Sequence, residues 1–279
     1  MFTHRPKFIS KVFIILFTLV IVVFFSWRFY VGNFLIAHAL GEYNGAFYTN
    51  SNEAFENSYK RGFRQFEVDL TKTTDNKVVC FHAYNQEIYE KLHIEQDNFT
   101  YDEFMSGKVF KEPRYRFTTL DLEQIIALMK KHKNIKVMMH LHSQEDAAVT
   151  KFLLDEIIKT ADGDEQIYDR ILIGINFPEE IPILTGQNKI RNIMYYINVK
   201  NKRSENLKKI KDITAFMKQN NIHIVSMPYK AIIKYPKEVK KLRKNNIYIY
   251  SFAQNSIKEI IKMKVIGVNA IGTDTIFEW

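Results

Sequence analysis

The chain has 279 residues, 46% of them hydrophobic and 14% aromatic, which is enough material for one large core. Its net charge is +9, but no nucleic-acid-binding motif accompanies the basic residues, so nucleic acid is not expected as a partner. The single cysteine, Cys80, excludes an internal disulfide. Lysine-rich runs in the second half have helical spacing, which fits either solvated helix faces or attraction to an anionic lipid or polymer.

The first element in the chain is an uncharged apolar stretch from Val12 to Trp27, which with its apolar flanks is long enough to span a bilayer. Three basic residues precede it (Arg5, Lys7 and Lys11), so the N-terminus is expected in the cytoplasm and the remainder outside. No small-residue cleavage site follows, which favours an uncleaved signal anchor over a removed signal peptide. We therefore expect residues 1–31 to be a cytoplasmic N-terminus and single-pass cell-membrane anchor, and residues 32–279 to form an extracellular domain.

Beyond Gly32, short β-type runs alternate with amphipathic helical segments. Strands are predicted at residues 34–39, 65–70, 77–82, 135–142, 170–176, 192–198, 222–228, 247–252 and 269–274. Helices are predicted at 51–62, 118–132, 145–160, 204–220, 236–245 and 255–264. Residues 83–117 are polar and irregular and are predicted to be an insertion or a long loop, with a short helical segment at 101–105. This alternation over roughly 245 residues favours a (β/α)8 TIM barrel over an open doubly wound sheet.

Two acids, Glu67 and Asp69, lie on one predicted strand, and their spacing points both side chains to the same face. Like charges on one face raise each other's pKa unless a cation lies between them. Carboxylate oxygens are the preferred ligands of hard divalent ions. The pair therefore predicts a divalent-metal site, with Mg²⁺ or Ca²⁺ as the expected ion.

Further titratable residues lie near the ends of other predicted strands: His38, His82, His140, His142 and Asp274. In a TIM barrel, the chemistry takes place where the strands end. A metal beside two histidines suits phosphate-ester chemistry, because one imidazole can take the proton of the attacking hydroxyl while the other protonates the leaving alkoxide. His38 and His82 are the candidates for this catalytic pair.

At these residues the chain resembles the glycerophosphodiester phosphodiesterase family, within the wider superfamily of phospholipase-C-like phosphodiesterases. The spacing from Phe55 through Gly62 and Glu67-Val68-Asp69 to His82 is similar to the family's opening motif. Later segments, TTLDLEQIIALM (118–129), IYIYSF (247–252) and GVNAIGTD (267–274), are similar to the family's later motifs, so the resemblance covers about residues 35–275.

The resemblance implies a TIM barrel, a divalent metal on the acid pair plus a third carboxylate, and two histidines as general acid and base. In many members a hydroxyl of the substrate attacks, giving a cyclic phosphate that water then opens. The chain departs from this pattern at several positions: Ala39 replaces an arginine, Thr49 a glutamate, Ala83 an aspartate, His140 the third acid, His142 a lysine and Tyr250 a tryptophan. We therefore expect Glu67, Asp69 and His140 at the metal, and Asn50, His142 and Tyr250 at the substrate.

The exchange of an acid for His140 lowers the negative charge around the metal, which makes Mn²⁺ or Zn²⁺ the alternative ions. His142 can stand in for a lysine only when it is protonated, so activity is expected to favour mildly acidic conditions. The leading hypothesis is a membrane-anchored, metal-dependent phosphodiester hydrolase. Its substrate is a glycerophosphodiester, a phospholipid headgroup or a phosphodiester-linked anionic polymer of the cell surface. The alternatives are a catalytically impaired barrel that binds a phosphodiester, and a lyase that releases a cyclic phosphate.

Overall fold

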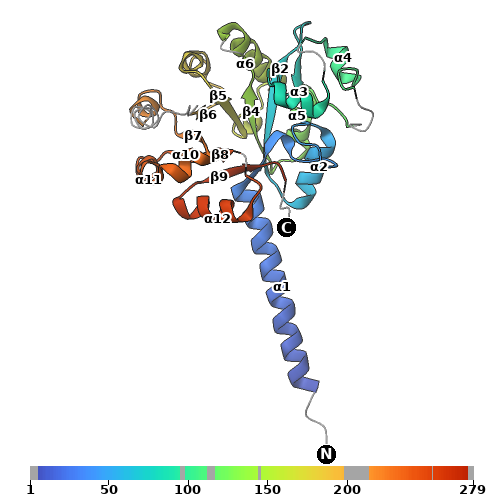
Figure 1. Cartoon of the computed structure of the whole chain (residues 1–279), viewed down its shortest axis with the longest axis vertical. Helices are drawn as coiled ribbons and strands as arrows, with labels where there is room; N and C mark the ends of the chain where they lie inside the picture. Colours follow the sequence, from blue (N-terminus) through green and yellow to red (C-terminus); the bar gives the residue numbers. More distant parts are fainter. Residues whose placement is uncertain are drawn as a thin grey trace, which may run out of the picture.

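Eight parallel strands close into a barrel in the computed structural model of the chain, which describes residues 6–94, 98–111, 117–143, 146–197, 214–252 and 254–275 (Figure 1). The order around the ring is β1, β2, β4, β5, β6, β7, β8 and β9, and β9 pairs with β1 to close it. The predicted TIM barrel is thereby confirmed. Its strands are β1 (Leu35–Ala37), β2 (Gln65–Lys72), β4 (Lys136–Leu141), β5 (Ile171–Ile175), β6 (Asn192–Tyr196), β7 (Ile224–Pro228), β8 (Tyr248–Phe252) and β9 (Ala270–Thr273).

The run predicted as a strand at 77–82 lies outside the ring. It contains β3 (Val78–Cys80), which pairs antiparallel with the end of β2 as a hairpin. The hairpin turn includes Asn76, whose φ is +59°. Because β3 runs back toward the barrel, the Phe81 N–H donates a hydrogen bond to the Asp69 carbonyl at 2.9 Å, and His82 reaches the rim.

Helices surround the barrel, and several of their ends are set by local capping residues. Ser51 caps one helix by accepting a hydrogen bond from the Ala54 N–H, and Asp121 forms a capping box with Gln124 at another. The helices are α2 (Asn52–Arg61), α5 (Leu122–Lys131), α6 (Ala147–Ala161), α7 (Glu165–Tyr168), α8 (Ile181–Thr185), α10 (Tyr229–Lys234), α11 (Pro236–Lys244) and α12 (Ile257–Ile266), with short 3-10 turns at His38–Leu40 and Pro178–Glu180. Most of the helix predicted at 204–220 lies outside the described residues, which resume at 214.

The insertion at 83–117 is more ordered than its polar sequence suggests. It contains α3 (Gln86–Leu92) and α4 (Tyr101–Met105), and only the second was anticipated. Phe81, Tyr89, Phe99 and Phe104 stack into a small apolar core of its own. The prediction of an irregular loop was therefore wrong for its described part, because widely spaced aromatic residues supply the core without giving a periodic pattern.

Strand residues that face outward pack against the helices in one continuous core, whereas a smaller set fills the barrel lumen. The lumen set is Ile36, Met138, Met194, Tyr196, Tyr250 and Ala270. Two glycines make room for its tyrosines. A Cβ atom on Gly174 would lie 2.7 Å from Tyr196 Cε2, and one on Gly272 would meet the Tyr250 hydroxyl. These rings form the floor beneath the strand ends.

Helix α1 (Pro6–Phe34) projects from the end of the barrel where the strands begin (Figure 1). Its stretch Lys11–Phe34 spans 24 residues and contains an 18-residue window with a mean hydropathy of 2.5, which by length and composition is enough to cross a membrane. Its described side chains are mostly exposed as far as Phe29, whereas Val31 and Phe34 are buried in the barrel core. The last turn of α1 therefore belongs to the domain, and Arg28 and Tyr30 just before it also lie against the domain.

Candidate active site

The titratable residues singled out from the sequence meet at the rim where the barrel strands end. In the parallel pairing of β2 with β4, Asp69 lies directly beside His140. The chain continues to His142, whose N–H donates to the Leu70 carbonyl at 3.0 Å. His38 follows β1 immediately, and the hairpin brings His82 to the same rim. Parallel pairing thus gathers residues that are far apart in the sequence.

His38 lies between two carboxylates. Its Nδ1 is 2.6 Å from Asp274 Oδ1, and its Nε2 is 3.3 Å from Glu67 Oε2. Asn255 holds Asp274 by donating to Oδ2 at 3.0 Å and accepting from the Asp274 N–H at 2.9 Å. Burial alone would lower the pKa of His38, but the charges of Glu67 and Asp274 outweigh it and raise that pKa to about 10. Without a metal, the imidazole is therefore protonated at neutral pH.

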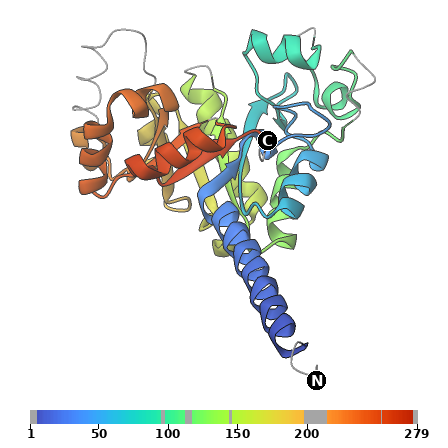
Figure 2. The same cartoon turned by 60° about the horizontal axis from the view of Figure 1, so that its bottom comes forward.

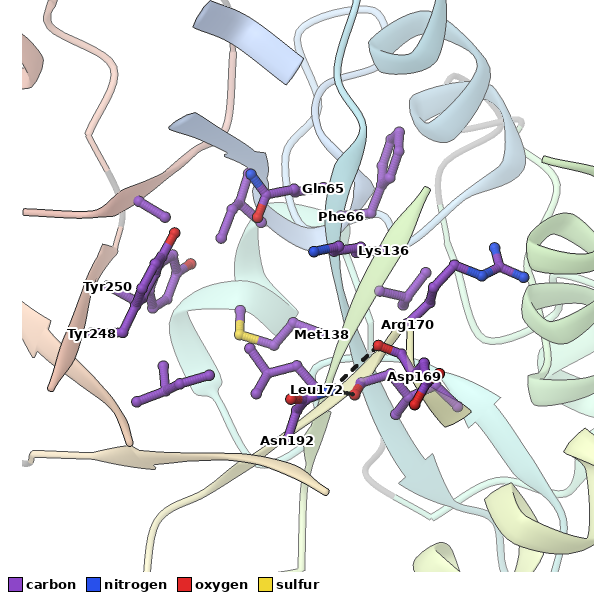
Figure 3. A pocket seen from close by; sticks show the side chains of 15 residues that line it. Gln65, Phe66, Lys136, Met138, Asp169, Arg170, Leu172, Asn192, Tyr248 and Tyr250 are labelled. Carbon is purple, nitrogen blue, oxygen red and sulfur yellow. Dashed lines mark hydrogen bonds between the residues drawn. The ribbon is translucent and has the colours of Figure 1, made fainter. Parts of the chain in front are cut away.

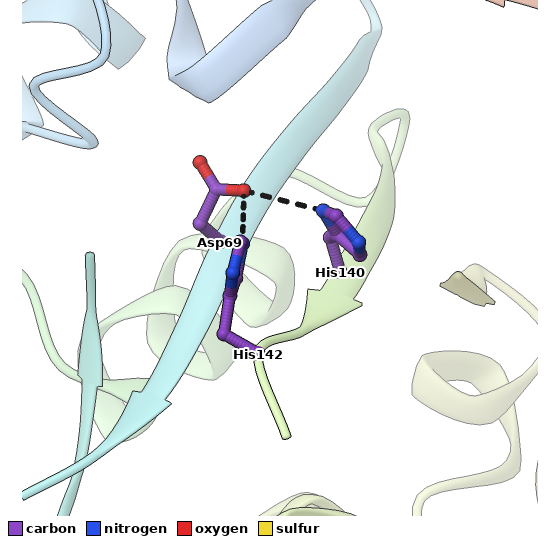
Figure 4. Close-up of side chains that lie close together, drawn as sticks. All are labelled: Asp69, His140 and His142. Carbon is purple, nitrogen blue, oxygen red and sulfur yellow. Dashed lines mark hydrogen bonds and ion pairs between the residues drawn. The ribbon is translucent and has the colours of Figure 1, made fainter. Parts of the chain in front are cut away.

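Asp69 has a different set of neighbours and is fully buried. Its Oδ1 lies 2.9 Å from His142 Nε2 and 3.5 Å from His140 Nδ1 (Figure 4). Burial would raise the pKa of this carboxyl, but the imidazoles of His82, His140 and His142 outweigh it and hold the pKa well below its usual range. Asp69 is therefore ionised and faces histidines.

Glu67 shares the lumen face of β2 with Asp69 but turns toward other partners. The Tyr196 hydroxyl donates to Glu67 Oε1 at 3.3 Å. Burial raises the pKa of Glu67, Asp69 adds to the rise, and His38 opposes it. The expectation that the two acids share one cation is only partly met, because each carboxylate has its own imidazole partner.

A group of ligand atoms suited to a divalent metal lies on one side of the rim. The ligand atoms of Asp69, His140 and His142 all lie within 4.8 Å of one another. Among the described residues, this set contains two of the three predicted ligands, with His142 in place of Glu67. His140 Nε2 also lies 2.9 Å from the Asn176 side-chain amide, the kind of outer partner that orients a metal-binding imidazole. One carboxylate and two imidazoles fit a divalent metal.

The predicted substrate-binding residues have other surroundings than expected. Asn50 is fully buried, and both atoms of its amide are engaged by Asp69, since Nδ2 donates to Asp69 Oδ2 and Oδ1 accepts from the Asp69 N–H, each at 3.0 Å. Tyr250 is 1% exposed within the lumen floor, a position that does not favour stacking of a substrate on its ring. In both cases the sequence placed the residue near the site but could not show how deeply its side chain is buried.

The surroundings of His142 do not favour its expected cationic role. Burial, reinforced by the neighbouring His140, lowers the pKa of His142 to about 4 despite its bond to Asp69. The ring is therefore neutral in mildly acidic and neutral solution and cannot replace a lysine. A neutral imidazole has a lone pair free for a metal, which agrees with its place beside Asp69 and His140.

Two tyrosines of the site were missed from the sequence. Tyr48 lies between His38 and His82, with ring centroids 4.9 Å and 5.9 Å from theirs. Tyr196 contacts two predicted metal ligands, since its ring lies 4.6 Å from that of His140 and its hydroxyl reaches Glu67. The alternation of β6 places Tyr196 on the lumen face, a signal that the strand prediction contained. Tyr48 sits in a loop with φ of +61°, which no periodic pattern marks.

Comparisons with known proteins agree with this geometry. Solved structures similar to the chain include a putative glycerophosphodiester phosphodiesterase from Galdieria sulphuraria (TM-score 0.68, 17% identity, covering 88% of this chain and 95% of that one). A second is a glycerophosphodiester phosphodiesterase from Parabacteroides distasonis ATCC 8503 (TM-score 0.64, 17% identity, covering 87% of this chain and 93% of that one). A third is an Oleispira antarctica phosphodiesterase in complex with the product sn-glycerol-3-phosphate (TM-score 0.62, 11% identity, covering 88% of this chain and 95% of that one). At these identities the likeness shows the fold alone.

No curated protein matches the chain. The model of the glycerophosphoryl diester phosphodiesterase family, in contrast, matches residues 42–278, a span that begins just after His38 and covers most of the sequence. The chain therefore belongs to the glycerophosphoryl diester phosphodiesterase family and is a phosphoric diester hydrolase.

Proposed function

We propose that the chain is a membrane-anchored, divalent-metal-dependent hydrolase of glycerophosphodiesters, with His38 as general acid and His82 as general base. The observation that carries this proposal is the pairing of opposite environments at one rim. His38 lies between the carboxylates of Glu67 and Asp274, which raise its pKa, whereas burial lowers the pKa of His82. Titratable groups whose pKa values are pushed apart are typical of an acid and base pair.

The division of roles between the two histidines follows from their neighbours. Asp274 accepts a hydrogen bond from the Nδ1–H of His38, which leaves Nε2–H directed to the site as a proton donor. Burial lowers the pKa of His82, with His140 and His38 adding to the effect against the opposing charge of Asp69. His82 is therefore neutral and able to accept a proton. The attacking oxygen bonds to phosphorus as its proton passes to His82, and the departing oxygen takes a proton from His38 as its bond to phosphorus breaks.

The metal is proposed to lie among Asp69, His140 and His142. Two nitrogen donors and one oxygen donor are better suited to Mn²⁺ or Zn²⁺ than to Mg²⁺ or Ca²⁺, which reverses the order expected from the acid pair. When bound, a divalent ion neutralises charge on the phosphoryl oxygens. Glu67 remains a proposed ligand through its buried Oε2, which lies near His38 but accepts no hydrogen bond from the described residues.

A glycerophosphodiester is the proposed substrate class, in agreement with the family and with the glycerol-3-phosphate named for the Oleispira antarctica structure. We further propose that residues 1–31 anchor the chain in the cell membrane and that residues 32–279 form the extracellular catalytic domain. The apolar stretch of α1 and the basic residues before it support this topology.

The test is hydrolysis of bis-p-nitrophenyl phosphate by the full chain in detergent, after chelation and then addition of single metals. We expect activity to return with Mn²⁺ or Zn²⁺ and to fall by about 10²–10⁴-fold in His38→Ala and in His82→Ala. His223→Ala is the matched control, because His223 is exposed at the opposite end of the barrel, just before β7 begins. Full activity in chelator, or wild-type rates in both variants, would refute the proposal. A phosphorus NMR signal from a cyclic product that persists would instead identify a lyase.

A further inference from the structure

The end of the barrel opposite the active site carries a strong excess of basic residues. It is formed by the segments that lead from a helix into the next strand, at 61–65, 131–136, 161–170, 186–192, 218–223, 243–247 and 264–269. Together these segments contain twelve Lys and Arg but four Asp and Glu. Most of the basic side chains are exposed, including Lys133, Lys189 and Arg191. We name this surface the basal face.

The basal face is also the end at which α1 enters the domain. Gly32 of α1 packs against the connection between α2 and β2, since a Cβ atom there would lie 3.2 Å from the Gly62 carbonyl oxygen. Lys264 Nζ lies 3.9 Å from the centre of the Phe34 ring. Figure 2 shows α1 leaving the barrel from this end, away from the insertion of α3 and α4. The exit of the helix and the basic surface therefore coincide.

The length of α1 places the basal face at the surface of a bilayer. From Lys11 to Phe29, the helix spans about 28 Å at 1.5 Å per residue, close to the hydrocarbon thickness of about 30 Å. Trp27 and Tyr30, whose stacked rings lie 6.2 Å apart, then fall at the interface where such aromatic side chains are favoured. The buried last turn, from Val31 to Phe34, follows directly.

We propose that the basal face rests on the anionic headgroups of the membrane that holds α1, so that the active-site rim faces away from this membrane and takes water-borne phosphodiesters. Basic side chains at a membrane surface are attracted to anionic lipid, which supplies the force. Both the anchoring by α1 and the substrate part of this inference rest on the proposed function. It excludes, as substrates, the phospholipid headgroups of the anchoring bilayer.

The barrel itself separates the membrane surface from the site. Asp69 lies four residues beyond Gln65, the first residue of β2, which is about 13 Å along the strand. A cavity of about 250 Å³ opens on the basal face, with Lys136 and Arg170 at its edge (Figure 3). Among the described residues, the lining of this cavity includes Met138 and Tyr250 of the lumen set but none of the rim histidines. A headgroup that enters from below meets this floor and not the histidines.

Energy transfer in nanodiscs tests the orientation without reference to activity. The full chain is placed in discs of phosphatidylcholine, with or without 30% phosphatidylglycerol, that contain an acceptor dye on a headgroup. A donor is attached at Asn188→Cys on the basal face or at Gln86→Cys on α3; both positions are neutral and exposed, and the native Cys80 is buried. We expect higher transfer from position 188 than from 86, and a further rise at 188 with phosphatidylglycerol. Equal transfer from both positions, or the reverse order, overturns the proposal.

Charge-reversal variants identify which surface causes the rise in energy transfer with phosphatidylglycerol. Lys133→Glu, Lys189→Glu and Arg191→Glu together should abolish the rise with phosphatidylglycerol at position 188. The same reversal at Lys77, Lys108 and Lys111, exposed near the opposite end, should leave it unchanged. If the control set removes the rise equally, general charge attraction explains it and the basal face has no special part.

A comparison of turnover between a soluble and a lipid substrate separates this inference from the proposed function. The same discs are supplied with soluble glycerophosphoglycerol, and released glycerol phosphate is compared with cleavage of the phosphatidylglycerol in the disc. Turnover of the soluble ester at least tenfold faster supports the inference, and comparable cleavage of the lipid overturns it. Absence of turnover of both esters would contradict the proposed function, while the transfer measurements would still decide the orientation.

Discussion

Asn50 offers the sharpest test of how the site is built, because its amide makes two hydrogen bonds and both go to Asp69. Its backbone has a φ of +46°, a left-handed conformation that glycine adopts without strain. Asn50→Gly therefore removes the amide without straining the chain. Asn50→Ala removes the same amide and adds about 1–2 kcal/mol of left-handed strain.

The size of the effect follows from what is left behind in a fully buried place. The Asp69 N–H loses its acceptor, at a cost of about 1–3 kcal/mol, and the Asp69 carboxylate loses a charge-assisted hydrogen bond worth about 1.5–3 kcal/mol. His140 and His142 still contact the carboxylate, and water can enter the gap. We therefore expect Asn50→Gly to lower the free energy of unfolding by about 3 kcal/mol and metal affinity by about 10–100-fold.

Urea unfolding of the metal-free full chain measures the first quantity, and titration calorimetry with Mn²⁺ measures the second. Asn44→Gly is the matched control, because Asn44 has a φ of +49° but is exposed. Its substitution should change the free energy of unfolding by less than about 0.5 kcal/mol. If Asn50→Gly behaves like this control and raises only the KM for substrate, Asn50 is a substrate contact and the reasoning from its buried bonds is refuted.

Three further predictions concern other residues of the site and of its floor. Asp274→Asn removes the charge that orients His38 and should lower kcat by about 10²–10⁴-fold with little change in KM; an unchanged kcat would contradict the assigned acid. In the metal-free protein, the pKa of His38 is raised from 6.5 to about 10. The folded state therefore binds more protons than the unfolded state between these two pH values. Stability is greatest below pH 6.5 and falls as the pH rises toward 10. Urea unfolding at pH 7 and pH 9 should show this fall, and His38→Gln should flatten it. Gly174→Ala should push the Tyr196 ring from beneath His140 and lower the free energy of unfolding by about 1–3 kcal/mol in the same assay, whereas a neutral result would contradict the close packing of the floor.

Most of the barrel could be predicted because its strands and helices have strong local signals. The eight parallel strands lie within or close to the predicted runs, and helix starts such as Ser51 and Asp121 carry their own caps. The hairpin strand β3 was predicted as a strand, but its antiparallel pairing outside the ring depends on a tertiary contact. The insertion was misjudged because its apolar residues are few and become a core only when α3 and α4 fold together.

The site was less predictable than the fold because the burial of each side chain and its hydrogen-bond partners depend on three-dimensional packing. Alternation along β2 correctly gave Glu67 and Asp69 a common face, yet it could not show that Tyr196 would approach one acid and Asn50 the other. Strand ends placed His142 at the rim, but its neutral state arises from burial beside His140. The roles of His38 and His82 remain predictions that the proposed variants address.

The charges of the rim support the proposed requirement for a cation. A phosphodiester carries a negative charge, and three carboxylates, Glu67, Asp69 and Asp274, approach the place where it binds. The arginine and lysine that the family pattern supplies are here Ala39 and His142, and Ala39 has no charge while His142 is neutral. The protonated His38 offsets one carboxylate, and Asp69 raises the pKa of His140 against the opposing effect of burial, so the positive charge of these imidazoles is balanced by the buried acids and is not free for an anionic substrate. The histidines make the buried acids tolerable to the protein, and we propose that the divalent ion is needed to neutralise the charge of the substrate.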